Sequence, residues 1–416
     1  MSAGTEETQD AHGGDTLGSL ARDYVAKLRG GDVGSLPAVL GLVVLVVAFS
    51  ILRPETFTKA FNFGNLIQQS AGVTIIAMGL VFVLLLGEID LAAGYTAGTA
   101  AAVTSLLLTS HDWPVAPALL VGLLTGTLIG FFIGTIVSRL GIPSFVVTLA
   151  LFLALQGVVL SIIGEKGSID SGEWIAKLNA DNLPVWLGWV IAVVLVGSYA
   201  ALTFVTNRRR RRHGLTSEPT LLWALKSGGL AVLTFLVVYY LSIERNPNAN
   251  IKSIKGVPIS LLVIIGLAIV LTVLLSRTRW GSHVYAVGGN AEAARRAGIN
   301  VKLVQLSCFM MCSTVAAIGG MMLASYSGGV NNVTGGNQTL LFAVGAAVIG
   351  GTSLFGGKGR VVDAIIGGTV VAVIANGMGL MNQPDSRKLI VTGLVLLVAA
   401  SVDAISRRKA AASGRV

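Results

Sequence analysis

Twelve apolar segments divide this chain, and each is about as long as a bilayer is thick. A helix needs about 20 apolar residues to cross the hydrocarbon layer, and only helices and closed barrels satisfy their backbone hydrogen bonds there. The composition agrees, because 53% of the residues are hydrophobic and only 12% are charged, whereas a soluble domain has about a quarter charged. The sequence therefore predicts an all-α polytopic membrane protein with about 12 transmembrane helices, within a range of about 10–14.

The expected spans form one transmembrane domain over residues 36–406. They are 36–52, 63–87, 91–110, 114–138, 143–163, 184–205, 221–243, 257–276, 303–326, 338–356, 361–382 and 388–405. A flexible polar tail is expected over residues 1–35, with a short amphipathic helix near Leu20–Leu28. A second tail is expected over 407–416. Two hydrophilic loops stand out between the spans, a basic one at 207–220 and a longer one at 277–302.

Basic residues indicate the orientation. Alternating the spans from an inside N-terminus places the run Arg208–Arg212, the loop 277–302 and the basic C-terminal residues on the same side. Cytoplasmic loops carry the excess of Lys and Arg, so both termini are expected in the cytoplasm. The run could also bind RNA, but no aromatic residues alternate with it. Contact with anionic lipid is favoured, and the net charge of +10 then requires no nucleic acid.

No catalytic site and no metal site are expected. The four histidines are scattered, and Cys308 and Cys312 lie one helical turn apart in an apolar span, where they are expected to pack. The stretch 350–360 has the look of a phosphate loop, but it lacks the first glycine and the Ser or Thr after Lys358. The chain should therefore bind no nucleotide of its own. Any ATP and Mg²⁺ would belong to a separate subunit.

Acidic residues near the membrane are few, and they occur at span ends. Glu88, Asp90, Asp363 and Asp403 all lie near an inner end, where each can pair with a basic residue, as Asp363 can with Arg360 and Asp403 with Arg407, or reach the interface. An ion-coupled carrier usually places charge inside the membrane, so a structural role for these four is the favoured interpretation.

A short helix is predicted in the loop 277–302. Asn290 is a suitable N-cap, Glu292 falls in the first turn, Arg295 and Arg296 fall in the last turn, and Gly298 can take the left-handed stop position. Two turns are not stable alone in water, so this helix should press against a partner subunit. The alternative is a capped surface turn.

Glycines are expected to bring helices close together, since small residues allow close backbone approach in lipid. Glycines are concentrated in two regions, residues 87–98 and residues 350–368. Segment 86–94 of the first region also aligns with segment 349–357 of the second, with Gly87 opposite Gly350, and the pair is interpreted as a same-direction repeat. The expected helix-packing residues are Gly87, Gly94, Gly350, Gly351, Gly356 and Gly357.

Four motifs in order resemble those of permeases in bacterial ABC importers for monosaccharides. They are Gly87–Gly94, Ile142–Leu149, Tyr285–Val301 and Ala346–Gly357, followed by Asn376-Gly377. The resemblance covers roughly residues 60–400 and, through an insertion at about 164–250, is nearest to the xylose-type members. Two departures are visible: Glu88 replaces a glycine, and Asn337–Val344 lacks the family's acidic residue.

The resemblance implies a type II ABC importer-like permease of a bacterial inner (plasma) membrane. Its expected partners are an ATPase subunit and an extracytoplasmic sugar-binding protein. It also implies a homodimer in membrane lipid that imports a monosaccharide, xylose or another pentose, by alternating access. The short helix would be the one that contacts the ATPase, through Asn290, Glu292, Ala293, Ala294, Arg295, Arg296 and Gly298. The alternatives are import of an autoinducer or a branched-chain amino acid, or an ion-coupled carrier.

Polar residues inside the spans are the candidates for the sugar route. They are Gln68, Gln69, Ser70, Thr148, Gln156 and Asn376. For each of them, a hydrogen bond between helices is the alternative role, because polar side chains commonly join helices in lipid.

Overall fold

The computed structural model describes residues 34–215, 219–246 and 253–412, and the side chains of 403 and 406–412 are not described. The chain divides into two units. The larger comprises residues 34–192 and 235–403, and the smaller includes residues 193–234. The amphipathic helix expected near Leu20–Leu28 lies outside the described residues.

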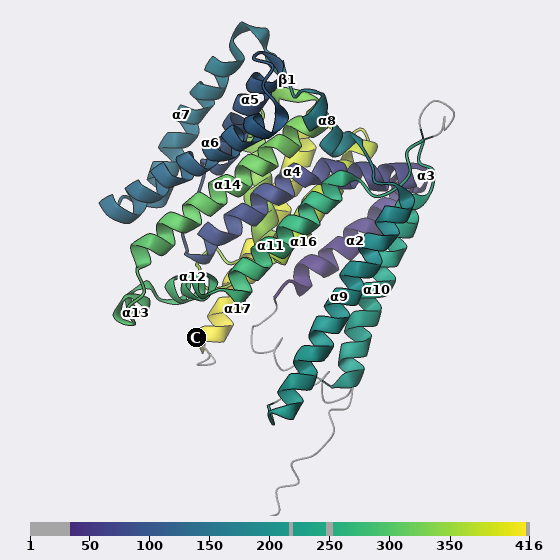
Figure 1. Ribbon diagram of the computed structural model, residues 1–416, viewed down its shortest axis with the longest axis vertical. Coiled ribbons are helices and arrows are strands. Elements are labelled where there is room, and N and C mark those ends of the chain that lie inside the picture. Colours follow the sequence, from purple (N-terminus) through teal and green to yellow (C-terminus); the bar gives the residue numbers. More distant parts are fainter. Residues whose placement is uncertain (1–33, 216–218, 247–252, 413–416) are drawn as a thin grey trace, which may run out of the picture. The chain divides into compact units, whose positions relative to one another are not determined.

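The chain is helical almost throughout (Figure 1). In order, the helices are α2 (Leu36–Leu52), α3 (Pro54–Phe57), α4 (Ala60–Leu85), α5 (Ala93–Thr109), α6 (Val115–Thr135), α7 (Ser144–Ile163), α8 (Glu173–Ala180), α9 (Val185–Arg212), α10 (Thr220–Ser242), α11 (Ile259–Arg277), α12 (Arg279–Gly289), α13 (Ala291–Arg296), α14 (Val301–Ser327), α15 (Asn337–Gly350), α16 (Val361–Leu380) and α17 (Asp385–Ala412). A π-turn, Ile136–Leu140, continues α6, and a 3₁₀ turn, Gly164–Lys166, continues α7.

Each of the twelve expected spans coincides with one of these helices, which confirms the all-α membrane fold. Among the described residues, eight helices are long and apolar enough to cross a membrane, namely α4, α6, α7, α9, α10, α11, α14 and α16. Helices α2 and α15 are apolar but shorter. The expected span 338–356 is too long, because α15 ends at Gly350 and the chain then turns.

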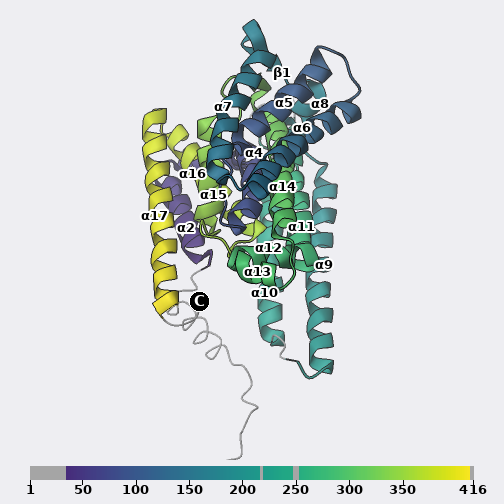
Figure 2. The same ribbon diagram turned by 90° about the vertical axis from the view of Figure 1, so that its left-hand side faces the viewer.

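Helix α14 lies in the middle of the larger unit and packs against α4, α5 and α6 (Figures 1 and 2). Its contact with α6 follows a glycine every fourth residue: Gly122, Gly126, Gly130 and Gly134. A Cβ atom on Gly130 would lie 2.5 Å from the carbonyl oxygen of Phe309. Glycine is therefore needed for the two backbones to approach this closely. Our sequence reading did not single out this stripe.

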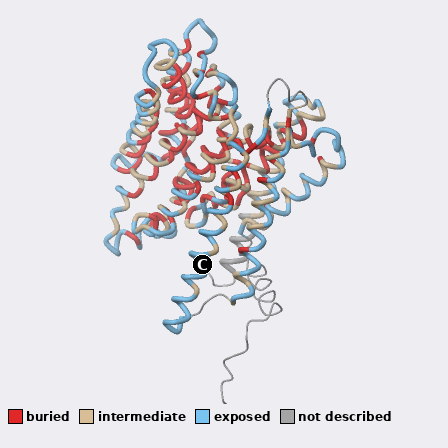
Figure 3. Tube along the Cα trace, turned by 45° about the vertical axis from the view of Figure 1, so that its right-hand side comes forward, coloured by how far each residue is buried: buried red, intermediate tan, exposed pale blue. Residues whose placement is uncertain are grey.

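The long apolar helices differ widely in how far they are buried. In α4 and α16, 72% of the most apolar window is buried, whereas in α9 and α10 only 11% is. Buried residues are gathered in the interior of the larger unit in Figure 3. A helix that is apolar all round and yet exposed is suited to hydrocarbon rather than to water.

The hydrophilic segments differ in detail from our predictions. The basic loop is shorter than 207–220, because α9 continues through the arginines to Arg212. The segment 277–302 is mostly helical, in α12 and α13. Helix α17 continues to Ala412, so much of the tail expected at 407–416 is helix, and 413–416 lie outside the described residues.

One two-stranded sheet lies among the described residues. Strands β1 (Ser168–Asp170) and β2 (Gly329–Asn331) pair antiparallel, with Ile169 opposite Val330. Both of these residues are buried. The pairing joins the segment after α7 to the segment after α14.

Candidate functional site

Helix α13 forms as its sequence predicts. The Asn290 side chain accepts a hydrogen bond from the backbone N–H of Ala293 at 2.9 Å. At the other end Gly298 has φ +86°, and the N–H of Ile299 donates to the carbonyl oxygen of Ala294. This is a Schellman ending, which stops the helix after two turns.

The charged side chains of α13 lie on its exposed face. Glu292 pairs with Arg295 and with Arg296, both at 3.2 Å, and all three side chains are more than half exposed. Exposed pairs of this kind contribute little to stability, so they leave the charged groups available to a partner. Ala293 and Ala297 share this exposure.

Ala294 departs from our expectation of contact with a partner. It is only 5% exposed and belongs to the main apolar core of the chain. Its role is to anchor α13 to the permease-like body, since its methyl group faces inward.

Helix α12 fixes α13 to three other segments, and our sequence reading did not predict it. The indole N–H of Trp280 donates to Ser307 Oγ of α14 at 2.8 Å, and the Tyr285 hydroxyl donates to the carbonyl oxygen of Gly359 at 2.8 Å. Burial raises the pKa of Tyr285, so its hydroxyl stays protonated and remains a donor. Gly288 lies directly against the end of α4, where a Cβ would be 1.9 Å from the Leu85 carbonyl oxygen.

Two glycine turns meet beside α12. At the end of α4, the N–H groups of Gly87 and Glu88 donate to the carbonyl oxygens of Leu84 and Val83. At the end of α15, those of Gly351 and Thr352 donate to Val348 and Ala347 in the same pattern. Both glycines have positive φ, +75° and +119°. Two matching helix ends therefore occur where the sequence suggested a repeat.

The alignment that we drew for this repeat is wrong by one residue. The hydrogen bonds place Gly87 opposite Gly351 rather than opposite Gly350. The two turns also touch, because the N–H of Gly357 donates to the Leu85 carbonyl oxygen at 2.8 Å. Gly87, Gly351, Gly356 and Gly357 have positive φ and lie in turns, while Gly94 lies close to the backbone of Gly335 and Gly350 close to that of Asp363.

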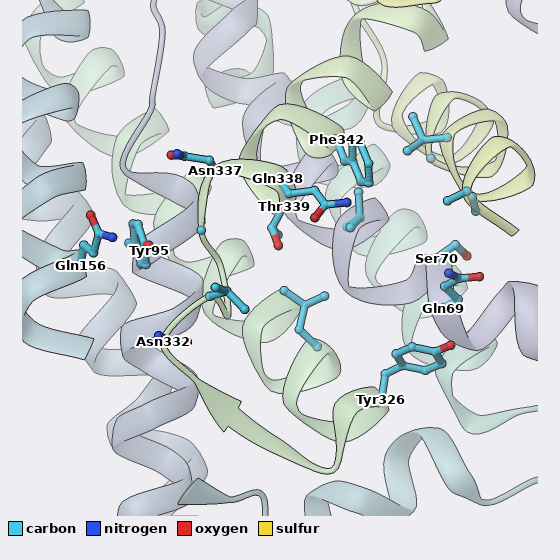
Figure 4. A pocket seen from close by; sticks show the side chains of 18 of the residues that line it. Gln69, Ser70, Tyr95, Gln156, Tyr326, Asn332, Asn337, Gln338, Thr339 and Phe342 are labelled. Atoms are coloured by element: carbon cyan, nitrogen blue, oxygen red, sulfur yellow. The ribbon is translucent and has the colours of Figure 1, made fainter. Parts of the chain in front are cut away.

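A cavity of about 690 Å³, lined by both polar and apolar side chains, lies among α4, α5, α7, α14, α15 and α16 (Figure 4). Three of the six candidates for the sugar route, Gln69, Ser70 and Gln156, line it. The sequence reading missed its other polar side chains, which are Tyr95, Tyr326, Asn332, Asn337, Gln338 and Thr339. Its lining contains no Asp, Glu, Lys or Arg among the residues that the structure describes.

The remaining three candidates join segments together. Gln68 exchanges hydrogen bonds with Asn179 of α8, and the Thr148 hydroxyl donates to the carbonyl oxygens of Ser144 and Ile89. Asn376 exchanges amide hydrogen bonds with Asn62 at 2.9 and 3.0 Å, and both residues are buried. These contacts match the alternative role that we gave them.

A second cavity, of about 680 Å³, shares Gln69 and Tyr326 with the first. It also reaches Asn376 and residues 244–246, which follow α10. The Glu244 carboxylate accepts hydrogen bonds from the Ser253 hydroxyl and from the Ile254 and Asn246 N–H groups, which lower its pKa to about 2. Glu244 therefore stays ionised, and its hydrogen bonds shape the rim of this cavity.

Comparison with known proteins identifies the family. The family described as "Branched-chain amino acid transport system / permease component" matches residues 62–400. The chain belongs to this permease family. No solved structure matches the permease.

Named relatives cover nearly the whole permease. It is 30% identical to the xylose transport system permease protein XylH of Escherichia coli K12, over 89% of this chain and 92% of the relative. It is 30% identical to XylH of Haemophilus influenzae, over 92% and 99%. It is 28% identical to the fructose import permease protein FrcC of Rhizobium meliloti, over 91% and 88%.

Proposed function

We propose that this permease is the membrane subunit of an ABC importer that moves a monosaccharide, xylose or another pentose, into the cytoplasm. A separate ATPase subunit would bind ATP and Mg²⁺, and an extracytoplasmic binding protein would deliver the sugar. Two copies of the chain would form the translocation unit, with their termini in the cytoplasm. The chain itself would hold no cofactor and catalyse no reaction.

The first cavity, whose described lining is uncharged and includes several amide and hydroxyl groups, is the observation that carries this proposal. Its volume of about 690 Å³ lies within the range of about 300–1,000 Å³ for small-molecule sites. Amide and hydroxyl groups can exchange hydrogen bonds with sugar hydroxyls, and neutral partners hold them weakly enough for release. The relatives named for xylose and fructose agree with such a substrate.

The description of the matching family also raises a branched-chain amino acid as the substrate. An amino acid carries an ammonium and a carboxylate, and burying either of them without an opposite charge is costly. The described lining of the cavity offers no opposite charge. A sugar therefore fits this cavity better, and leucine is a useful negative control.

Coupling to the ATPase would run through α13 and α12. The exposed pairs of Glu292 with Arg295 and Arg296 would contact the ATPase. Closure of the ATPase on ATP would move α13, and α12 would carry this displacement to α4 and α14 through Gly288 and Trp280. ATP can shift the permease between two states only if these contacts differ between the states.

The test is uptake of labelled xylose, ribose, galactose and leucine into proteoliposomes. They would contain the permease and its ATPase, with ATP on the ATPase side and the binding protein on the other. We expect uptake of xylose that requires both ATP and the binding protein. Uptake of leucine alone would overturn the substrate class, and uptake driven by an ion gradient without ATP would overturn the mechanism.

A further inference from the structure

The two large cavities follow one another along α4 and α16. On α4, the second cavity is lined by residues from Ala60 to Gln69, and the first by residues from Gln69 to Val73. On α16 the second cavity lies toward the end of the helix, and Ala375 belongs to both cavities. A helix rises by about 20 Å between Ala60 and Val73. The two cavities together therefore extend over about two thirds of the thickness of a hydrocarbon layer.

Three residues lie where the cavities meet, since Gln69, Tyr326 and Ala375 line both of them. Tyr326, near the end of α14, is 43% exposed. Its hydroxyl lies 3.5 Å from Asn65 Oδ1, which is at the limit for a hydrogen bond. Figure 4 shows Gln69 and Tyr326 on the same side of the first cavity, away from Gln156. The Tyr326 ring is thus only weakly held at the junction.

The second cavity differs from the first in charge. Arg245 donates to Asn182 Oδ1 at 2.7 Å and to the Gly256 carbonyl oxygen at 2.8 Å, and Lys388 pairs with Asp385 at 2.9 Å. Charged side chains within a membrane protein commonly line water-filled spaces, and these partners hold the charged groups at the wall. The second cavity is therefore suited to be an aqueous entrance. The charged residues of its lining are Glu55, Lys59, Glu244, Arg245 and Lys388.

We propose that the second cavity is the outer entrance to the sugar route, and that Tyr326 and Gln69 form the passage from it into the first cavity. The inference rests on the proposed function, because α4 begins and α16 ends on the outer side when both termini are cytoplasmic. A sugar presents hydroxyl groups and apolar C–H faces. Tyr326 offers a flat ring with a hydroxyl group, and Gln69 offers an amide. The size of the side chain at position 326 then sets how readily the sugar passes.

The test measures access to the first cavity from the outer side with a membrane-impermeant thiol reagent. Ser70→Cys places a thiol in the lining of the first cavity only, and Ala60→Cys places one in the lining of the second cavity only. Cys308 and Cys312 are buried, and the unaltered permease gives their background. The permease and its ATPase are placed in proteoliposomes, the reagent is added on the side of the binding protein, and the faster of the rates with and without ATP is compared.

Tyr326→Trp should slow labelling in Ser70→Cys by about tenfold, because the larger ring overpacks the passage. Tyr326→Ala should speed it, and neither change should alter labelling in Ala60→Cys. Tyr239→Trp is the matched control, since Tyr239 is 60% exposed on α10 and lines neither cavity. It should leave both rates unchanged.

An unchanged rate in Ser70→Cys/Tyr326→Trp would overturn the passage. Equal slowing in Ala60→Cys/Tyr326→Trp would overturn it as well, because the effect would then lie outside the junction. Labelling does not depend on which solute is carried. The expected labelling together with ATP-driven uptake of leucine in place of a sugar would therefore support the passage and overturn the proposed substrate.

Discussion

Replacing Gly288 by alanine should disturb the link between α12 and α4. The added Cβ would lie 1.9 Å from the Leu85 carbonyl oxygen, and ordinary contact begins near 3.4 Å, so α12 must move away by about 1.5 Å. That carbonyl also accepts the hydrogen bond from Gly357, so the contact with the second glycine turn would be strained as well. Overpacking of this kind costs about 1–3 kcal/mol.

Helix propensity acts in the opposite direction at this position. Alanine is better than glycine inside a helix by about 1 kcal/mol, so a net loss of about 0–2 kcal/mol in the free energy of unfolding is expected. Gly289 is the matched control, because a Cβ there would meet no atom within 4 Å. Gly289→Ala should leave stability unchanged or raise it slightly.

The assay compares thermal unfolding, sugar uptake and ATP hydrolysis of both variants in proteoliposomes. Gly288→Ala should lower the amount of sugar moved per ATP hydrolysed, since the displaced α12 no longer follows α4, while Gly289→Ala should not. A Gly288→Ala variant as stable and as well coupled as the unaltered permease would refute this account of α12.

Three further predictions concern α13, the cavity and the amide pair. Arg296→Glu should lower uptake by roughly tenfold or more through loss of a charged contact at an interface without preventing membrane insertion. The swap Glu292→Arg/Arg296→Glu restores the internal ion pair, and recovery of uptake in it would contradict contact with the ATPase. Gln156→Leu should reduce uptake about two- to tenfold through loss of one hydrogen bond with unchanged thermal unfolding; a normal rate would remove Gln156 from the sugar route. Asn62→Leu should cost about 1–3 kcal/mol by leaving the Asn376 amide unpaired, and Asn62→Leu/Asn376→Leu should recover part of this; no recovery would show that the pair acts otherwise.

Local features of the chain could be predicted well. The small helix α13 follows its sequence, because an N-cap and a Schellman ending depend on atoms only a few residues apart. Helix α12 was missed, because its apolar face is short and its anchors, Ser307 and Gly359, lie far along the chain. The polar run Asn337–Thr339 was noticed for lacking an acidic residue, and its place in the cavity could have been suspected from that polarity within an apolar span.

The six candidates for the sugar route could not be told apart from the sequence. All six are polar residues in apolar helices, and nothing local separates Gln68 from Gln69. The structure places Gln69 in the cavity and pairs Gln68 with Asn179, since adjacent residues on a helix face different directions.

The sequence by itself determined the membrane class and the approximate positions of the helices that coincide with the twelve expected spans, because a run of about 20 apolar residues is stable in a bilayer as a helix. It also determined the caps of α13. Only the tertiary structure decided which glycines turn the chain and which bring α6 against α14, and which polar groups line a cavity. Those outcomes depend on contacts between residues distant in the chain, and the apolar pattern of each helix is compatible with more than one set of neighbours.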